Sequence, residues 1–185
     1  MANATGRVEL RIYDLSQGVA RQWSKLLLGE QIDAIPHTGI VVEWFAGGEG
    51  LGSPPDLGNS ADLGSSADLG SLQIEYFLGG GASTPALTSH LRPDGSPRPE
   101  RPIRICVSRP GHSGMDHLPP SEIVPLGTTT RTRSDLDAYI EQLSPQFDAL
   151  SYDVLDNNCN HMSERIALFL VGSRLPARVG DCPGQ

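Results

Sequence analysis

The stretch 156–172, DNNCNHMSERIALFLVG, limits how the end of this 185-residue chain can fold. Aspartate and asparagine are preferred at helix N-caps, and three such residues directly precede Cys159. The apolar residues that follow have the spacing of one helix face: Met162, Ile166, Phe169 and Leu170. Gly172 is a typical helix stop. The stretch therefore predicts a helix that begins at or just before Cys159 and ends at Gly172.

A cysteine in the first turn of a helix is open to two interpretations. Unpaired backbone N–H groups and the positive end of the helix dipole favour a thiolate, and the same N–H groups can hold an oxyanion. The alternative is a small buried hydrophobic side chain, which is the usual state of a cysteine outside a disulfide. The polar neighbours of Cys159 on both sides favour an exposed first turn, and so a nucleophile.

A thiolate nucleophile needs a histidine as its base, and the chain has five histidines. His161 is nearest in sequence, but two residues along a helix are about 200° apart around its axis, so the ring faces away. His37 begins the segment HTGIVVEWF, whose composition is that of a central strand, and a fixed backbone there can aim the ring. The remaining histidines lie in segments rich in proline and glycine and are expected to be solvated: His90, His112 and His117.

A zinc site is the other common use of cysteine and histidine. The candidate ligands are Cys106, His112, His117 and Cys182. They contain no C-x-x-C pair and none of the spacings of known zinc modules. We therefore expect no metal, and the sequence indicates no cofactor.

The composition restricts the partners and the compartment. A net charge of −8 and a pI near 5.0 argue against nucleic acid and against anionic membrane as partners. Three cysteines, far apart, do not form a disulfide framework. No apolar run approaches the roughly 20 residues of a membrane span, and the first residues lack the apolar core of a signal peptide. The expectation is a cytoplasmic protein, with the nucleus as a second location.

The rest of the chain is predicted to mix strands and helices. Alternating or β-branched residues predict strands at 8–12, 37–45, 74–78, 103–107 and 122–126, the last an edge strand because of Pro125. Apolar spacing predicts helices at 19–28, where Val19, Trp23, Leu26 and Leu27 share a face and Gly29 follows, and at 134–143, with Ser134 and Asp137 as a capping box. Gly79, Gly80 and Gly81 are expected to form a turn after their strand.

Two polar segments interrupt this pattern, at 46–72 and 82–102. The first contains DLGNSA, DLGSSA and DLGS in succession, a six-residue period. Hexapeptide repeats can build a parallel β-helix, but fewer than three full copies cannot bury a core. Both segments are interpreted as flexible insertions in a single domain of 1–185, and 177–185 as a loose C-terminal tail.

Several segments together resemble the PPPDE family, the permuted papain-fold thiol peptidases that include the desumoylating isopeptidases. They are VELRIYDLSQGVARQWSKLLLGEQI, HTGIVV, YFLGGGA, EIVPLGTTTRTRSDLDAYIEQL and YDVLDNNCNHMSERIALFLVG. The resemblance implies an α+β, permuted papain-like fold, with a small antiparallel sheet packed with helices and the nucleophile at the start of a late helix. It also implies a dyad in which Cys159 is the nucleophile and His37 the general base and acid.

The resemblance further implies the substrates. In the family these are isopeptide bonds at the C-terminal glycines of SUMO or, for some members, ubiquitin, and Gly79, Gly80 and Gly81 are candidates for one wall of a narrow substrate groove. The two insertions leave the choice of ubiquitin-like modifier open. An acyl-protein thioesterase, a deubiquitinase using the same dyad, and a non-catalytic binding module are the alternatives. The resemblance also implies that the protein can form a homodimer.

Overall fold

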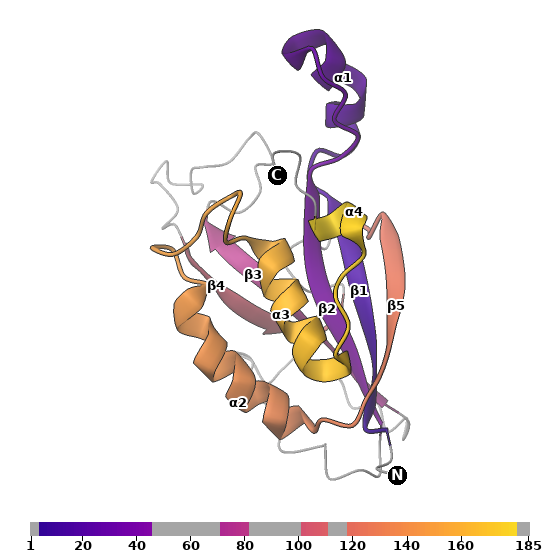
Figure 1. Cartoon of the computed structure of the whole chain (residues 1–185), viewed down its shortest axis with the longest axis vertical. Helices are drawn as coiled ribbons and strands as arrows, with labels where there is room; N and C mark the ends of the chain where they lie inside the picture. The colour runs from indigo at the N-terminus through magenta and orange to yellow at the C-terminus, as the bar shows by residue number, and fades with distance from the viewer. Residues whose placement is uncertain (1–3, 46–70, 82–100, 111–117, 181–185) are drawn as a thin grey trace, which may run out of the picture.

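A computed structural model describes residues 4–45, 71–81, 101–110 and 118–180. Its centre is a five-stranded antiparallel sheet with the strand order β4-β3-β2-β1-β5 (Figure 1). The strands are β1 (Gly6–Asp14), β2 (Pro36–Phe45), β3 (Ser71–Gly81), β4 (Arg101–Ser108) and β5 (Glu122–Thr129). The helices are α1 (Val19–Leu28), α2 (Arg133–Leu143), α3 (Cys159–Val171) and α4 (Ala177–Gly180), with a 3₁₀ turn at Ser144–Gln146. The predicted α+β class is confirmed.

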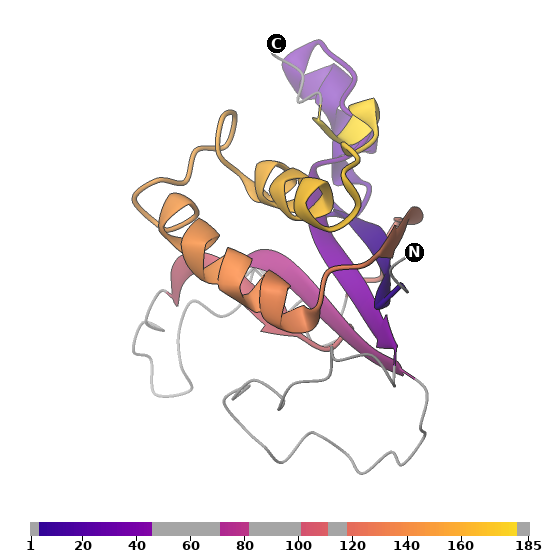
Figure 2. The same ribbon diagram turned by 60° about the horizontal axis from the view of Figure 1, so that its bottom comes forward.

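The core lies between the sheet and α3. Strand residues alternate between the two faces of a sheet, so β2 turns Ile40, Val42 and Trp44 toward α3, where all three are fully buried. From α3, Met162 and Ile166 pack against them with no exposed surface. The helix α2 lies on the same side of the sheet (Figures 1 and 2) and adds its own buried leucines to the core. The sequence prediction that 37–45 is a central strand is therefore confirmed.

The predicted helix start at Cys159 is confirmed in detail. Asn158 is the N-cap of α3, and its side-chain oxygen accepts from the backbone N–H groups of Asn160 and His161. Gly172 ends the helix with φ 68°, a left-handed conformation that glycine adopts without strain. The capping box of α2 differs from the prediction. Thr132 and Asp135 form it, two residues before Ser134 and Asp137, because Arg133 is already helical.

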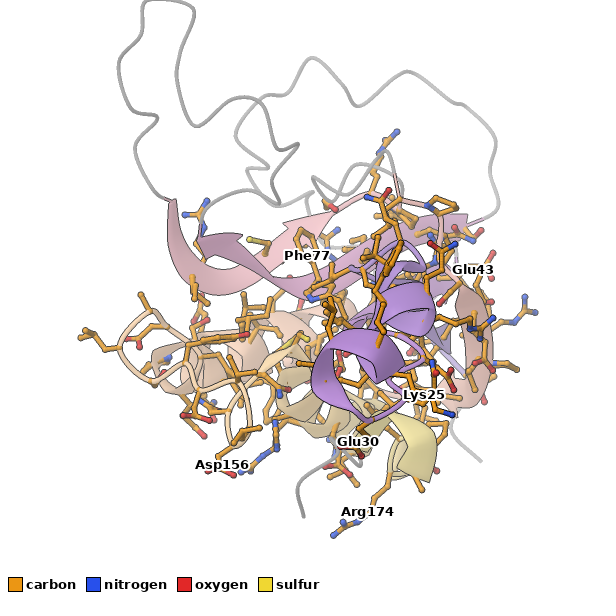
Figure 3. The ribbon with its side chains drawn as sticks, turned by 90° about the horizontal axis from the view of Figure 1, so that it is seen from above. Lys25, Glu30, Glu43, Phe77, Asp156 and Arg174 are labelled. Atoms are coloured by element: carbon orange, nitrogen blue, oxygen red, sulfur yellow. The ribbon has the colours of Figure 1, made fainter. Side chains whose placement is uncertain are left out.

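The helix α1 has the predicted bounds but not a buried apolar face. It rises away from the sheet (Figure 1), and Trp23 is 50% exposed and Leu27 74% exposed. Its only buried residue is Ser24, whose hydroxyl accepts from the N–H of Ile32 at 2.7 Å. Figure 3, which looks at the α1 end of the molecule, shows Lys25 on this helix apart from Asp156 in the loop before α3. The amphipathic pattern of α1 therefore does not contribute to the described core.

Three segment boundaries differ from the sequence interpretation. The residues Gly79–Gly81 continue β3 rather than forming a turn, with a register shift against β4 between Gly79 and Gly81. The strands β3 and β4 also take in 71–72 and 101–102, which the interpretation had placed in the insertions. Residues 177–180 form α4, in which Val179 is 2% exposed and belongs to the core. The rest of both insertions, 46–70 and 82–100, and 181–185 lie outside the described residues.

Candidate active site

Cys159 is the first residue of α3 and is 8% exposed. The sequence interpretation expected an exposed first turn because its neighbours are polar. The expectation is wrong because those neighbours bond to the backbone and to one another, and so close over the start of the helix. The thiol still lies at the positive end of the dipole of a 13-residue helix, which favours the thiolate.

The loop before α3 is held by asparagine side chains. The Asn157 amide donates to the Gln146 carbonyl at 2.7 Å and to the Ser151 carbonyl at 2.8 Å. The Asn158 amide donates to the Val154 carbonyl at 2.6 Å. These bonds tie the residues directly before α3 to the preceding loop, so the two asparagines fix where the helix begins.

The cap also decides which amides can bind an anion. The N–H groups of Asn160 and His161 donate to the Asn158 side-chain oxygen at 2.9 and 3.4 Å, and the N–H of Met162 donates to the Asn158 carbonyl at 3.1 Å. From the sequence, the first-turn N–H groups were expected to be able to hold an oxyanion. At these three positions they are already used, so an oxyanion has to be held by other groups.

Thr38 joins the central strand to the nucleophile. The side chain is fully buried, and its hydroxyl lies 3.2 Å from the Cys159 carbonyl, 3.0 Å from Asn160 Oδ1 and 2.9 Å from Ser163 Oγ. A hydroxyl has one proton, so Thr38 donates to one of the two carbonyl-type oxygens and can accept from Ser163. This contact places the first turn of α3 directly over the start of β2.

Asn160 extends this contact to the sulfur. Its Oδ1 lies 3.6 Å from Cys159 Sγ, within reach of the S–H, as well as 3.0 Å from the Thr38 hydroxyl. Asn160 is 5% exposed, so both contacts are shielded from water. A neutral amide here orients the thiol without placing a negative charge beside it.

His37 is the second residue of β2, directly before Thr38. In the register of the sheet it pairs with Tyr13 of β1, and the two ring centroids are 6.3 Å apart at an angle of 47°. The residue is half-buried, but its Nε2 is buried and has no hydrogen-bond partner among the described residues. Burial lowers the pKa of His37 from 6.5 to about 4. The imidazole is therefore neutral at neutral pH and able to accept a proton.

The chain that leads to His37 is fixed by Asp14 at the end of β1. Its carboxylate accepts from the N–H groups of Ser16, Gly18 and Ile35 at 2.9, 2.8 and 3.1 Å. Burial alone would raise the pKa of Asp14, but these hydrogen bonds and one from the Ser16 hydroxyl hold it below its ordinary value. Asp14 thus joins the two ends of the segment that contains α1, and its contact with Ile35 lies two residues before His37.

His161 is engaged in the helix cap. Its Nδ1 lies 3.3 Å from the Asn158 N–H and 3.0 Å from the Asn158 side-chain oxygen, completing a capping box. The ring therefore serves the start of α3. Four other candidate residues lie outside the described residues: His90, His112, His117 and Cys182. In the described ranges no three metal-binding side chains come together, and none of the helices there is long and apolar enough to cross a membrane.

The glycines of β3 lie toward the His37 end of the sheet. Phe77 pairs with Gly39, and continuing this antiparallel register by two residues brings Gly79 level with His37. A Cβ on Gly79 would come within 2.7 Å of the Phe77 ring and 3.0 Å of Cys106 Sγ. Gly79 is therefore required by the packing of its own strand, which is a reason for glycine that the sequence analysis did not consider.

The residues that join these parts were not predicted from the sequence. Thr38 and Asn160 directly follow His37 and Cys159 in the sequence, but neither belongs to a motif that would indicate its contacts. Glu75 did carry a signal, because a carboxylate between Ile74 and Tyr76 in a central strand is a buried charge in an apolar run. That signal alone would not have said what the carboxylate contacts.

Known proteins give the same family as the motifs. The model of the family described as "PPPDE putative peptidase domain" matches residues 65–185, which include Cys159 but not His37. The chain is 27% identical to desumoylating isopeptidase 1 of Homo sapiens over 179 residues, covering 96% of this chain and 75% of that protein. The corresponding protein of Xenopus laevis is 26% identical over 182 residues, with the same coverage, 96% and 75%.

A shorter similarity points the same way. A DeSI-like protein of Arabidopsis thaliana, At4g17486, is 41% identical over 62 residues, which are 30% of this chain and 28% of that protein. The family model covers more than half of the chain, and the longer relatives cover nearly all of it. The chain therefore belongs to the PPPDE family of cysteine-type peptidases.

Proposed function

We propose that this protein is a thiol isopeptidase that removes SUMO or a related ubiquitin-like modifier from its conjugates, with Cys159 as nucleophile and His37 as general base and acid. The observation that carries the proposal is the hydrogen bond from the strand start to the helix start, Thr38 to the Cys159 carbonyl. Because Thr38 is the next residue after His37, this bond keeps the backbones of the two candidate residues together. The names of the relatives, desumoylating isopeptidase 1, support the substrate class.

In the proposed reaction His37 takes the Cys159 proton as the sulfur attacks the isopeptide carbonyl carbon. The tetrahedral intermediate collapses to a thioester, and the imidazolium gives its proton to the leaving lysine amine. Water then attacks the thioester with His37 again acting as base, which releases the modifier with a free C-terminal carboxylate and restores the thiol. A His37 that is neutral at rest, as its lowered pKa requires, suits a base that acts during attack.

Glycines at the end of a modifier would need a groove too narrow for side chains. Gly79, Gly80 and Gly81 are our candidates for one wall, because β3 runs on past Phe77 toward the level of His37. In this interpretation Gly80→Val sharply reduces turnover of a Gly-Gly isopeptide conjugate. Alkylation of Cys159 by a small reagent, which does not need the groove, stays nearly unchanged. Equal loss of both rates would mean that the dyad or the fold had been disturbed.

The direct test is labelling by ubiquitin-like proteins that carry a thiol-reactive group at the C-terminus. A panel of SUMO, ubiquitin and other modifiers is offered to the wild type, to Cys159→Ser and to His37→Ala. We expect a covalent adduct with SUMO or a close relative, no adduct with Cys159→Ser and strongly slowed labelling of His37→Ala. Cys106→Ser and Cys182→Ser serve as matched controls and should label normally.

The same panel separates the alternatives. Labelling by ubiquitin alone would make the protein a deubiquitinase. Failure with every modifier, together with hydrolysis of an acyl thioester that depends on Cys159, would make it an acyl-protein thioesterase. Failure in both assays by a folded wild-type protein would leave a binding module and overturn the proposal.

Two further properties belong to the proposal. We propose a cytoplasmic location extending to the nucleus, which imaging of the tagged full chain tests. We also propose a homodimer, from the family resemblance, which sedimentation at several protein concentrations tests.

A further inference from the structure

The face of the sheet away from α3, here called the second face, holds a buried carboxylate in contact with a tyrosine. Tyr13 of β1 donates its hydroxyl proton to Glu75 Oε1 of β3 at 2.6 Å. Glu75 is fully buried and Tyr13 is 3% exposed. Burying a carboxylate in a central strand costs free energy unless hydrogen bonds or ion pairs compensate for its lost hydration, so the pair requires an explanation.

The carboxylate lies over Gly39, on the same face as His37. A Cβ built on Gly39 would be 2.8 Å from Glu75 Oε1, so only a residue without a side chain leaves room for this carboxylate. Alternate residues of a strand share a face and lie roughly 6.6 Å apart, which starts the His37 side chain next to Gly39 on the second face. His37 is the second residue of β2, so its ring lies at the end of the sheet, where the first turn of α3 contacts Thr38. Glu75 Oε1 therefore lies over the strand position that is next to His37 on this face.

Tyr13 bridges the space between them. It pairs with His37 in the strand register, and its ring lies 6.3 Å, centroid to centroid, from the imidazole. The Tyr13 ring is thus adjacent to the His37 imidazole, and its hydroxyl is hydrogen-bonded to Glu75. Three buried atoms of this cluster, which also includes Arg11 of β1, have no hydrogen-bond partner among the described residues: His37 Nε2, Glu75 Oε2 and Arg11 Nε. Unpartnered buried polar atoms are rare in folded proteins, and a catalytic role is one of the explanations for them.

We propose that Tyr13 and Glu75 are positioning residues for the His37 imidazole, and this inference rests on the proposed role of His37. The hydrogen bond to Glu75 locks the Tyr13 ring, and the locked ring limits the rotation of the imidazole beside it. The pair thereby supplies the orienting third group that a Cys–His dyad otherwise lacks.

The charges around the cluster are compatible with this role. Burial raises the pKa of Glu75, while the Tyr13 hydrogen bond and the positive charge of Arg11 oppose that rise. Burial also raises the pKa of Tyr13, so its hydroxyl stays a donor at neutral pH. The groups that face His37 on this side are thus Arg11 and Tyr13 from β1 and Glu75 from β3.

The test measures the thiol without any ubiquitin-like substrate. In a Cys106→Ser, Cys182→Ser background, the rate of Cys159 alkylation by iodoacetamide is followed from pH 5 to pH 10. Tyr13→Phe and Glu75→Gln are compared with Glu43→Gln, a matched carboxylate change at the far end of the same face of β2. We expect alkylation at pH 7 to be slowed about 10-fold to 100-fold in the first two, with the pH profile displaced to higher pH. Glu43→Gln should overlay the parent.

Circular dichroism and thermal melts of each variant separate positioning from stability. A lowered melting temperature with an unchanged pH profile in folded Tyr13→Phe would make the pair purely structural and overturn the inference. Tyr13→Phe keeps the ring and removes one oxygen, so it remains informative if Glu75→Gln does not fold. The double variant Tyr13→Phe, Glu75→Gln should be no slower than the slower single variant, because the two side chains act as a unit.

His37→Ala in the same background distinguishes failure of the Cys159–His37 dyad from failure of the positioning role of Tyr13 and Glu75. If it displaces the profile and the pair variants do not, the inference fails and the dyad stands. If His37→Ala leaves the profile unchanged, His37 does not act on Cys159, and the dyad and the inference both fall.

Discussion

The Thr38 hydroxyl lies 3.2 Å from the Cys159 carbonyl, a contact between residues 121 positions apart in the sequence. It links the beginning of the central strand to the beginning of the helix that carries the thiol. The same hydroxyl lies 3.0 Å from Asn160 Oδ1, which in turn lies 3.6 Å from the sulfur. The position of the candidate nucleophile is thus fixed from the strand on which His37 lies.

Replacing Thr38 by valine tests this link, because valine keeps the shape and removes the hydroxyl. The polar groups of Asn160 and Ser163 then lose a buried partner, so we expect a loss of about 1–3 kcal/mol in the free energy of unfolding. Turnover should fall more than the folded fraction does, since the helix start is released. Denaturant titration and kcat give the two values. Thr128→Val, on the exposed part of β5, is the control and should change stability by about 0.5 kcal/mol or less.

Asn160→Asp tests the electrostatics beside the sulfur. The change is nearly isosteric but places a carboxylate where Oδ1 lies 3.6 Å from Cys159 Sγ. A negative charge so close disfavours the thiolate and raises the pKa of the thiol, so alkylation at pH 7 should slow and regain its rate at higher pH. Asn160→Ala, which removes the amide without adding charge, should show a smaller displacement. Equal displacement in both variants would mean that the lost hydrogen bond, not the charge, is responsible.

Gly39→Ala tests the space that Glu75 occupies. The added methyl group would meet Glu75 Oε1 at 2.8 Å and the Phe77 Cβ at 3.4 Å. We expect a loss of about 1–3 kcal/mol in the free energy of unfolding, which thermal and denaturant melts measure. Combining Gly39→Ala with Glu75→Ala should cost less than the sum of the two single changes, because the second removes the clash. Strict additivity would show that the methyl group is accommodated elsewhere.

The buried imidazole predicts a pH dependence of stability. The pKa of His37 is about 4 in the folded protein and 6.5 ordinarily. Between these pH values the unfolded chain binds a proton at His37 that the folded protein does not, so stability falls as the pH falls through this window. Above pH 6.5 the contribution is constant. His37→Gln should therefore lose less melting temperature than the wild type between pH 7 and pH 4.5, and parallel curves would contradict the assignment.

The exposed face of α1 predicts tolerance to polar substitution. Leu27 is 74% exposed whereas Leu136 of α2 is fully buried. Leu27→Gln should change the free energy of unfolding of the monomer by about 0.5 kcal/mol or less. Leu136→Ala should reduce it by about 2–5 kcal/mol. Similar losses at both positions would mean that α1 packs against the core in solution.

Local sequence determined the elements that obey local rules. Asn158, Cys159 and Gly172 set the bounds of α3 because caps and stops act over only a few residues. The alternation in β1 and the β-branched run in β2 identified these strands for the same reason, and Pro125 correctly indicated an edge strand. The choice of His37 and Cys159 as candidates also came from the chain alone, from an apolar strand start and a helix start.

Only the tertiary structure decided what those residues touch. The helix pattern of α1 does not reveal that its apolar face stays outside the core, since a hydrophobic stripe says nothing about which surface covers it. The polar neighbours of Cys159 suggested exposure, yet the cap and Thr38 bury it, because those groups bond to one another in the fold. Likewise, the meeting of Tyr13 and Glu75 above Gly39 depends on the register of three strands, which no single segment contains.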